Sequence, residues 1–296
     1  MQLSMRRRQQ ALIICRLLVG SSLLVLVACG SSTSPGASTA FPTPTPPATP
    51  GPSPTATINP ILSRNRAQGC DPQAPSPLAG EVRTGHAPGT TAPTPREVAI
   101  TFDDGPAPSS TPAILSFLEQ TKTPATFFLI GRQAQQWPAL VQREWNDGFA
   151  LGNHTWDHPD MENRTATGMW LELSKTQQAI HSAIGAQACI WFWRPPYEDV
   201  DGAVVKAAQS LGLTTVTWDV DPADWSRPGA DVIVARVLTQ VHPGAIILLH
   251  DGGGPRDQTL AALPGILAGL HSDGLTPVTL PRLLADGGYP GVAIAA

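Results

Sequence analysis

Short apolar runs alternate with longer segments along the chain from about residue 96 onward. The short runs are rich in β-branched and aromatic residues, which is typical of buried strands. The predicted strands are Glu97–Phe102, Thr126–Ile130, Ala150–Asn153, Ile190–Arg194, Thr214–Trp218, Ala245–Leu249 and Pro277–Leu280. The longer segments repeat their apolar residues with the period of a helix. The predicted helices are Pro112–Glu119, Gln135–Glu144, Met169–Ile184, Val204–Leu211, Val232–Val241 and Leu260–Leu270.

This alternation predicts an α/β fold of parallel strands joined by right-handed crossovers. About seven strands are close to a closed or incomplete barrel of the (β/α) type, which would form a single domain over residues 96–286. A doubly wound open sheet is the alternative. Both architectures place chemistry at the carboxyl ends of the strands.

Ionisable residues follow five of the predicted strands. They are Asp103 and Asp104; His154 and His158; Arg194 with Tyr197; Asp219, Asp221 and Asp224; and His250 with Asp251. A scatter of ordinary loop residues would not collect this set at one end of a sheet, so we expect a site there.

The stretch VAITFDDGP, residues 98–106, ends a buried strand with two adjacent carboxylates, Asp103 and Asp104. Adjacent like charges cost stability unless a proton or cation intervenes. An acidic turn is the simple interpretation. The stretch HTWDH adds two imidazoles four residues apart, His154 and His158. Two His and one Asp are the ligand pattern of a catalytic zinc site with an open position, and the cation would keep both aspartates ionised.

The first 28 residues read as an export signal. Arg6–Arg8 precede the uncharged apolar run Leu17–Ala28, which is too short to span a bilayer unaided. The run ends LVAC, which resembles a lipobox, so Cys29 is expected to be lipidated and to anchor the protein outside the cell membrane, facing the wall. An ordinary signal peptide with a chance Cys is the alternative.

Residues 29–60 are rich in Pro, Ser and Thr and predict an extended tether. Residues 61–95 form an N-terminal extension whose role the sequence does not indicate, and residues 287–296 form a C-terminal tail. Without the four Arg of residues 1–28, 15 basic residues face 23 acidic ones, a net charge of −8. This charge argues against nucleic-acid binding. We expect a monomer.

Cysteine usage agrees with export. Cys15 is removed with the signal, and Cys29 is expected to carry the lipid. Cys70 and Cys189 remain as an even pair in an oxidising compartment. They form either a disulfide bond or two separate buried thiols, because the sequence supplies no geometry.

Five motifs, TFDDGP, HTWDH, RPPY, DPADW and LLH, appear in order over about residues 96–286. In the order and spacing of these motifs, the chain resembles the polysaccharide deacetylase family, carbohydrate esterase family 4. The resemblance implies a distorted (β/α) barrel, a divalent metal that is usually zinc, and removal of acetyl groups from N-acetylated sugars or, in some branches, O-acetylated xylan.

The same resemblance implies roles for individual residues. Asp104, His154 and His158 would bind the metal, Asp103 would be the general base, and His250 the general acid. Arg194 would hold Asp103, and Asp224 would orient His250. The backbone N–H of Tyr197 would stabilise the oxyanion, and Trp225 and Leu248 would line the acetyl pocket.

Several of these residues also have simpler interpretations. Arg194 taken alone would form a surface ion pair, and Trp225 and Leu248 would be core residues. Trp191, Trp193 and Trp218 are expected in the core. Asp219, Asp221 and Asp251 are expected to be solvated loop acids. Glu198 follows RPPY where many family members have Gly, which puts the shape of the groove in doubt.

The leading hypothesis is N-deacetylation of a GlcNAc-containing polymer. The predicted wall-facing location favours peptidoglycan or an exported amino-sugar polymer, and chitin stays open. The alternatives are an O-acetyl xylan esterase and a catalytically silent sugar-binding lipoprotein. The silent form would be expected to lack Asp103 or His250, and both are present.

Overall fold

The computed structural model describes residues 82–83, 96–186 and 188–286. The predicted signal, the tether, Cys29, Cys70, almost all of the extension and the C-terminal tail lie outside these residues, and those predictions stay open. Among the described residues, no helix combines the length and apolar character that crossing a bilayer requires.

One sheet of parallel strands forms the centre of the described domain. Its strands are β1 Val82–Arg83, β2 Glu97–Gly105, β3 Thr126–Leu129, β4 Ala150–Asn153, β5 Phe192–Trp193, β6 Thr214–Val216, β7 Ile246–His250 and β8 Thr276–Val278. The order is β1-β6-β5-β4-β3-β2-β7, with β8 pairing the first half of β2. Strands β2 to β8 correspond to the seven predicted ones, and β1 is an addition.

A short contact joins the segment after β6 to β7, at the far end of the sheet. Beyond β6 the chain continues to Val220, which pairs in parallel with Ile247 of β7. The Leu248 N–H donates to the Val220 carbonyl at 2.9 Å. The strands therefore curve into a distorted barrel, which confirms the predicted architecture over the open sheet.

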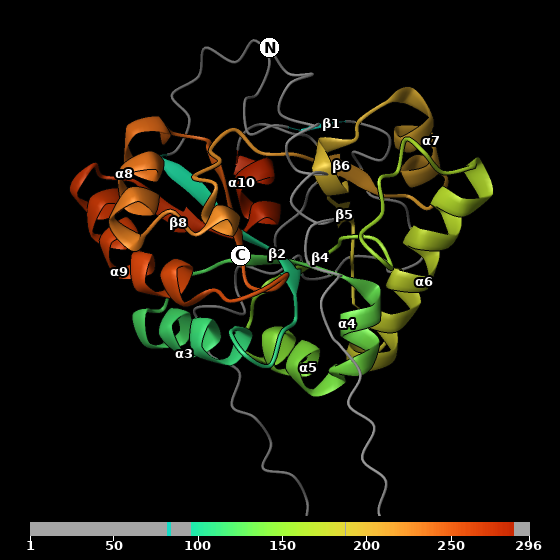
Figure 1. Cartoon of the computed structure of the whole chain (residues 1–296), viewed down its shortest axis with the longest axis horizontal. Helices are drawn as coiled ribbons and strands as arrows, with labels where there is room; N and C mark the ends of the chain where they lie inside the picture. The colour runs from blue at the N-terminus through green and yellow to red at the C-terminus, as the bar shows by residue number, and fades with distance from the viewer. Residues whose placement is uncertain (1–81, 84–95, 187, 287–296) are drawn as a thin grey trace, which may run out of the picture. The chain divides into compact units, whose positions relative to one another are not determined.

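Helices surround the strands (Figure 1). They are α3 Thr111–Thr121, α4 Gly131–Gln136, α5 Pro138–Asn146, α6 Ala166–Ile184, α7 Gly202–Ser210, α8 Ala230–Gln240, α9 Asp257–Ser272 and α10 Leu280–Asp286. The predicted helix Gln135–Glu144 is wrong as one element, because Pro138 has no N–H and starts a new helix. Leu280, predicted as the end of a strand, begins α10.

Alternation along β2 sorts its side chains between two environments. Val98, Ile100 and Phe102 join the main apolar cluster, together with the inner faces of the surrounding helices. Thr101 and Asp103 point the other way, where both contact Arg194. The outer face of the strand thus makes the core, and the inner face carries chemistry.

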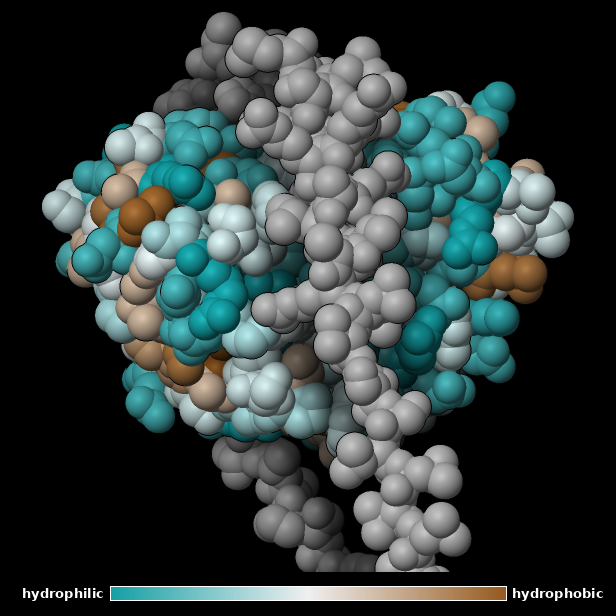
Figure 2. All heavy atoms as spheres, in the orientation of Figure 1, coloured by the Kyte–Doolittle hydropathy of each residue, from teal (hydrophilic) through white to brown (hydrophobic). Residues whose placement is uncertain are grey.

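The predicted core tryptophans are mostly buried: Trp193 completely, Trp191 nearly so, and Trp218 in part. Cys189 forms a disulfide bond whose partner lies outside the described residues, so its pairing with Cys70 stays a prediction. Where described atoms are visible in Figure 2, hydrophobic residues form small groups among hydrophilic ones.

Candidate active site

A bulge in β2 lets two consecutive aspartates reach the same site. Successive strand residues normally point to opposite faces of a sheet. The register of β2 against β3 shifts between Asp103 and Gly105, and Asp104 has the left-handed backbone angle φ 73°. This extra residue turns the Asp104 side chain toward the side that Asp103 already faces. Asp103 Oδ2 and Asp104 Oδ1 lie 3.7 and 3.5 Å from His154 Nε2.

The two histidines come from the segment after β4. His158 Nε2 lies 3.3 Å from Asp104 Oδ1. His154 Nδ1 lies 2.7 Å from the Arg194 backbone carbonyl, to which it must donate a proton. Its Nε2 is therefore free to offer a lone pair. Thr155 and His158 both have left-handed backbone angles, φ 66° and φ 58°, so a tight turn sets the direction of the rings.

Electrostatics in this cluster favour an added positive charge. Burial would raise the pKa of Asp104, but His154, His158 and His250 hold it well below its ordinary range. Burial would lower the pKa of His154, yet Asp103 and Asp104 raise it. Burial and the neighbouring His154 lower the pKa of His158 to about 4. The pKa values of the two imidazoles are therefore shifted in opposite directions.

The same three residues fit a divalent cation. Asp104, His154 and His158 each offer one ligand atom, and these three atoms lie within 4.8 Å of one another. Asp104 Oδ1 is buried without a hydrogen-bond partner, although both histidine Nε2 atoms face it. One carboxylate and two imidazoles form a zinc-type donor set with room for a fourth ligand.

Arg194 lies in the interior of the barrel and is completely buried. Its Nη1 donates to Asp103 Oδ1 at 2.7 Å and to Thr101 Oγ1 at 2.8 Å, while Nη2 donates to the Thr217 carbonyl at 3.1 Å. The guanidinium also stacks 4.2 Å from the Phe128 ring centre. The surface ion pair that Arg194 suggested in isolation is therefore wrong, and the expected contact with Asp103 is present.

His250 and Asp224 form a second buried pair. His250 Nδ1 lies 2.7 Å from Asp224 Oδ1, and Asp224 Oδ2 accepts from the His250 N–H and from Thr259 Oγ1. Burial would lower the pKa of His250, but Asp224 outweighs it and raises the pKa to about 9. His250 is therefore an imidazolium at neutral pH, a form that can donate a proton from Nε2.

The residues predicted to contact substrate differ in exposure. The Tyr197 ring is half exposed and lies 4.8 Å from the His158 ring centre, on a backbone with φ 58°. Glu198 follows with φ 62°, an angle that glycine adopts more readily. Trp225 is 41% exposed beside Asp224, whereas Leu248 is buried on β7.

Sequence reasoning missed the burial of two acids that lie near the site, Asp251 and Glu172. Asp251 was expected to be solvated, yet it is completely buried and accepts a hydrogen bond from Thr111. Burial and nearby aspartates raise its pKa to about 7. Its place directly after His250 at a strand end was the available signal. Glu172 lies within α6 and contacts the histidine segment, and nothing in the sequence marked it.

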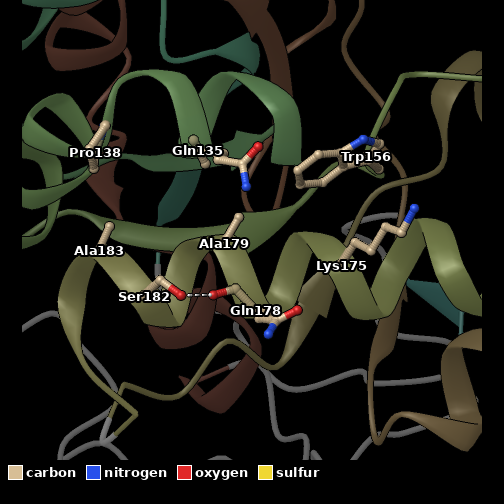
Figure 3. A pocket seen from close by; sticks show the side chains of 9 residues that line it. Gln135, Pro138, Trp156, Lys175, Gln178, Ala179, Ser182 and Ala183 are labelled. Atoms are coloured by element: carbon tan, nitrogen blue, oxygen red, sulfur yellow. Dashed lines mark hydrogen bonds between the residues drawn. The ribbon is translucent and has the colours of Figure 1, made fainter.

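A groove of about 560 Å³ lies between α4 and α6, behind the histidine segment. Figure 3 shows Gln135 of α4 and Ala179 of α6 on its two sides, with Trp156 at one end. The Lys175 ammonium lies 5.9 Å from the Trp156 ring centre. The groove contains none of the predicted catalytic or metal-binding residues.

Fold and site together define an α/β barrel with an Arg194–Asp103 pair and an Asp224–His250 pair beside an Asp-His-His cluster. Comparison with known proteins specifies the class. The family model described as polysaccharide deacetylase matches residues 90–216. The chitooligosaccharide deacetylase of Sinorhizobium fredii is 41% identical over 204 residues, which is 66% of this chain and 93% of the relative.

The peptidoglycan-N-acetylglucosamine deacetylase of Bacillus cereus is 39% identical over 189 residues, 63% of this chain and 87% of the relative. A crystal structure of a peptidoglycan N-acetylglucosamine deacetylase superimposes with a TM-score of 0.64 at 34% identity, covering 69% of this chain and 92% of that one. The chain belongs to the polysaccharide deacetylase family and is a polysaccharide N-deacetylase.

Proposed function

We propose that this protein is a metal-dependent hydrolase that removes acetyl groups from N-acetylglucosamine units of a polysaccharide. The observation that carries the proposal is the convergence of two ion pairs on one cluster. Arg194–Asp103 and Asp224–His250 both lie beside Asp104, His154 and His158. This arrangement supplies a base, an acid and a cation site within one small volume.

Asp104, His154 and His158 would hold the cation. When bound, a divalent cation polarises the acetamide carbonyl and lowers the pKa of water at the site. Asp103 would accept a proton from the attacking water. The bond to Arg194 fixes the orientation of the Asp103 carboxylate.

His250 would donate its proton to the sugar nitrogen as the C–N bond breaks. The water's hydroxyl joins the acyl carbon, so the products are acetate and a sugar amine. Asp224 keeps His250 protonated. Because Asp224 holds Nδ1, the other ring nitrogen, Nε2, is the one that can donate a proton to the substrate. The Tyr197 backbone N–H would stabilise the oxyanion, and Trp225 and Leu248 would contact the acetyl methyl.

Two lines of support indicate the substrate class. Relatives are named for chitooligosaccharides and for peptidoglycan N-acetylglucosamine, both of which carry the same N-acetylated sugar. The sequence pattern LVAC with Cys29 favours a lipid-anchored protein outside the cell membrane, next to the wall. Peptidoglycan or an exported amino-sugar polymer is therefore the proposed substrate, with chitin as a further candidate.

Acetate release tests the function directly. The purified protein is incubated with peptidoglycan, chitin oligomers, poly-N-acetylglucosamine and acetylxylan, with and without a chelator. Release from one or more of the three N-acetylated substrates, lost on chelation and restored by zinc, is expected. Release from acetylxylan alone would instead support an O-acetyl esterase. No release from any substrate would support a silent sugar-binding protein, although Asp103 and His250 are both in place.

A further inference from the structure

The segment His154–His158 is held by a complete set of backbone hydrogen bonds. Its five N–H groups all have acceptors within the described residues. They are the Leu129 carbonyl for His154, Asn153 Oδ1 for Thr155, Glu172 Oε2 for Trp156 and Asp157, and Thr155 Oγ1 for His158. The carbonyls of Thr155 and Trp156 accept from Gly131 and Arg132. Both proposed histidine ligands therefore lie on a turn in which every backbone N–H has an acceptor.

Glu172 is the only charged acceptor in this set. Its Oε2 receives the N–H groups of Trp156 at 2.9 Å and Asp157 at 3.0 Å. The side chain is buried on α6, and its other oxygen lies 3.9 Å from Arg164 Nη2. Hydrogen bonds to an ionised acceptor are about twice as strong as neutral ones. Two of them at adjacent N–H groups act on the middle of the turn between His154 and His158.

The turn requires such support because its geometry is unfavourable in isolation. Thr155 and His158 have left-handed backbone angles, which non-glycine residues adopt only when the surroundings enforce them. Thr155 is also β-branched, which makes this angle still less favourable. Glu172 anchors the two residues that lie between these strained positions.

We propose that Glu172 is a positioning residue that holds the histidine turn in metal-binding geometry. The proposal rests on the proposed function, since it assigns Asp104, His154 and His158 to a metal. Glu172 does not touch the site itself. It acts through the backbone of Trp156 and Asp157, and its contribution is therefore seen in metal affinity rather than in the chemistry of the loaded enzyme.

Glu172→Ala tests the assignment, with zinc affinity measured by competition against a chromophoric chelator. Removal of a residue that orients ligands typically costs about 10–100-fold in metal affinity, and this loss is expected. Glu172→Gln keeps the shape and an oxygen acceptor without the charge, so a smaller loss is expected. Saturating zinc should restore much of the turnover in both variants.

Thr176→Val is the matched control. Thr176 is buried one turn further along α6, and its hydroxyl donates to the Glu172 backbone carbonyl. This change perturbs the same helix without removing a hydrogen bond to the turn, so the melting temperature of the metal-free protein should fall while zinc affinity stays within about twofold. A merely structural Glu172 would behave in the same way as this control.

Four outcomes would overturn the assignment. The first is zinc affinity within about twofold of wild type in Glu172→Ala. The second is an equal loss of affinity in Thr176→Val. If Glu172→Ala does not fold, unchanged affinity in Glu172→Gln decides against it. A wild-type protein that binds no zinc would overturn the proposed metal dependence, and the role of Glu172 with it. Normal wild-type binding with normal variant binding would remove only the role of Glu172.

Discussion

Asp103 and His250 are register partners on the adjacent parallel strands β2 and β7. Paired residues of neighbouring strands point to the same face, so the carboxylate and the imidazole emerge side by side at the carboxyl ends. Each is held from behind by an opposite charge, Arg194 for Asp103 and Asp224 for His250. A proposed base and a proposed acid are thus placed by strand pairing.

The two adjacent aspartates should fail differently when each is changed to Asn. Asp103→Asn keeps all three proposed ligands, so the metal should remain bound. Turnover should nevertheless fall by about 10²–10⁴-fold because the proton acceptor is lost. Asp104→Asn should weaken metal binding, with partial recovery in excess zinc. Metal content and turnover of both variants check this. Equal metal loss in the two would mean that the roles are wrongly divided, and near-normal activity in both would mean an acidic turn.

Activity should decline on the alkaline side as His250 loses its proton. Burial lowers the pKa of His250, but Asp224 raises it overall from 6.5 to about 9. Because a general acid works only when protonated, kcat/KM falls as pH rises through this pKa. A bound cation repels the imidazolium and lowers the pKa of His250. In the metal-loaded enzyme, the alkaline decline of kcat/KM is therefore centred at a pH below about 9.

Asp224→Asn removes the carboxylate that raises this pKa. The alkaline limb of the kcat/KM profile should therefore move toward the ordinary histidine pKa of 6.5. Asp221→Asn is the control, because Asp221 accepts from the Ala223 N–H and makes no hydrogen bond to His250 among the described contacts. A limb that stays in place in Asp224→Asn would show that another group titrates.

Loss of Arg194 should destabilise the protein strongly. It is fully buried, and its removal leaves the Asp103 carboxylate without its 2.7 Å partner. For Arg194→Met, the free energy of unfolding should fall by about 3–5 kcal/mol, the cost of breaking one side of a buried ion pair. The double variant with Asp103→Asn should lose less, because no unpaired charge remains. Urea denaturation of the two metal-free variants measures the difference, and equal losses would contradict the argument.

Glu198→Gly should relieve backbone strain. Glu198 has φ 62°, and an unfavourable angle of this kind costs about 1–3 kcal/mol in a non-glycine residue. Glycine adopts the angle freely but loses more entropy on folding. We therefore expect an unchanged free energy of unfolding, or an increase of up to about 1 kcal/mol. The control Glu162→Gly is at an exposed turn position without positive φ and should destabilise by about 0.4–1 kcal/mol, through the larger entropy of the unfolded glycine chain. A loss in Glu198→Gly as large as in the control would refute the strain.

The sequence alone determined the class of fold and the end of the barrel that carries the site. Local apolar periodicity predicts which segments are strands and which are helices. The carboxyl ends of parallel strands all lie at one end of the barrel. The sequence therefore predicts that five residues lie together at this end: Asp103, His154, Arg194, Asp224 and His250. Pro138 also indicates that Gln135–Glu144 divides into two helices, but the apolar periodicity continues across it and predicts a single helix.

Only the tertiary structure decided how neighbouring residues point. Period-two alternation predicts that Asp103 and Asp104 face opposite sides of β2, and the bulge with φ 73° at Asp104 brings them to one site. The support of the histidine turn by Glu172 could not be predicted either, because it depends on how α6 packs against residues 15 and 16 positions earlier in the chain. Burial of Arg194 and Asp251 is likewise a property of the assembled barrel. Local sequence sets element type, whereas bulges, left-handed turns and buried charges arise from contacts between distant segments.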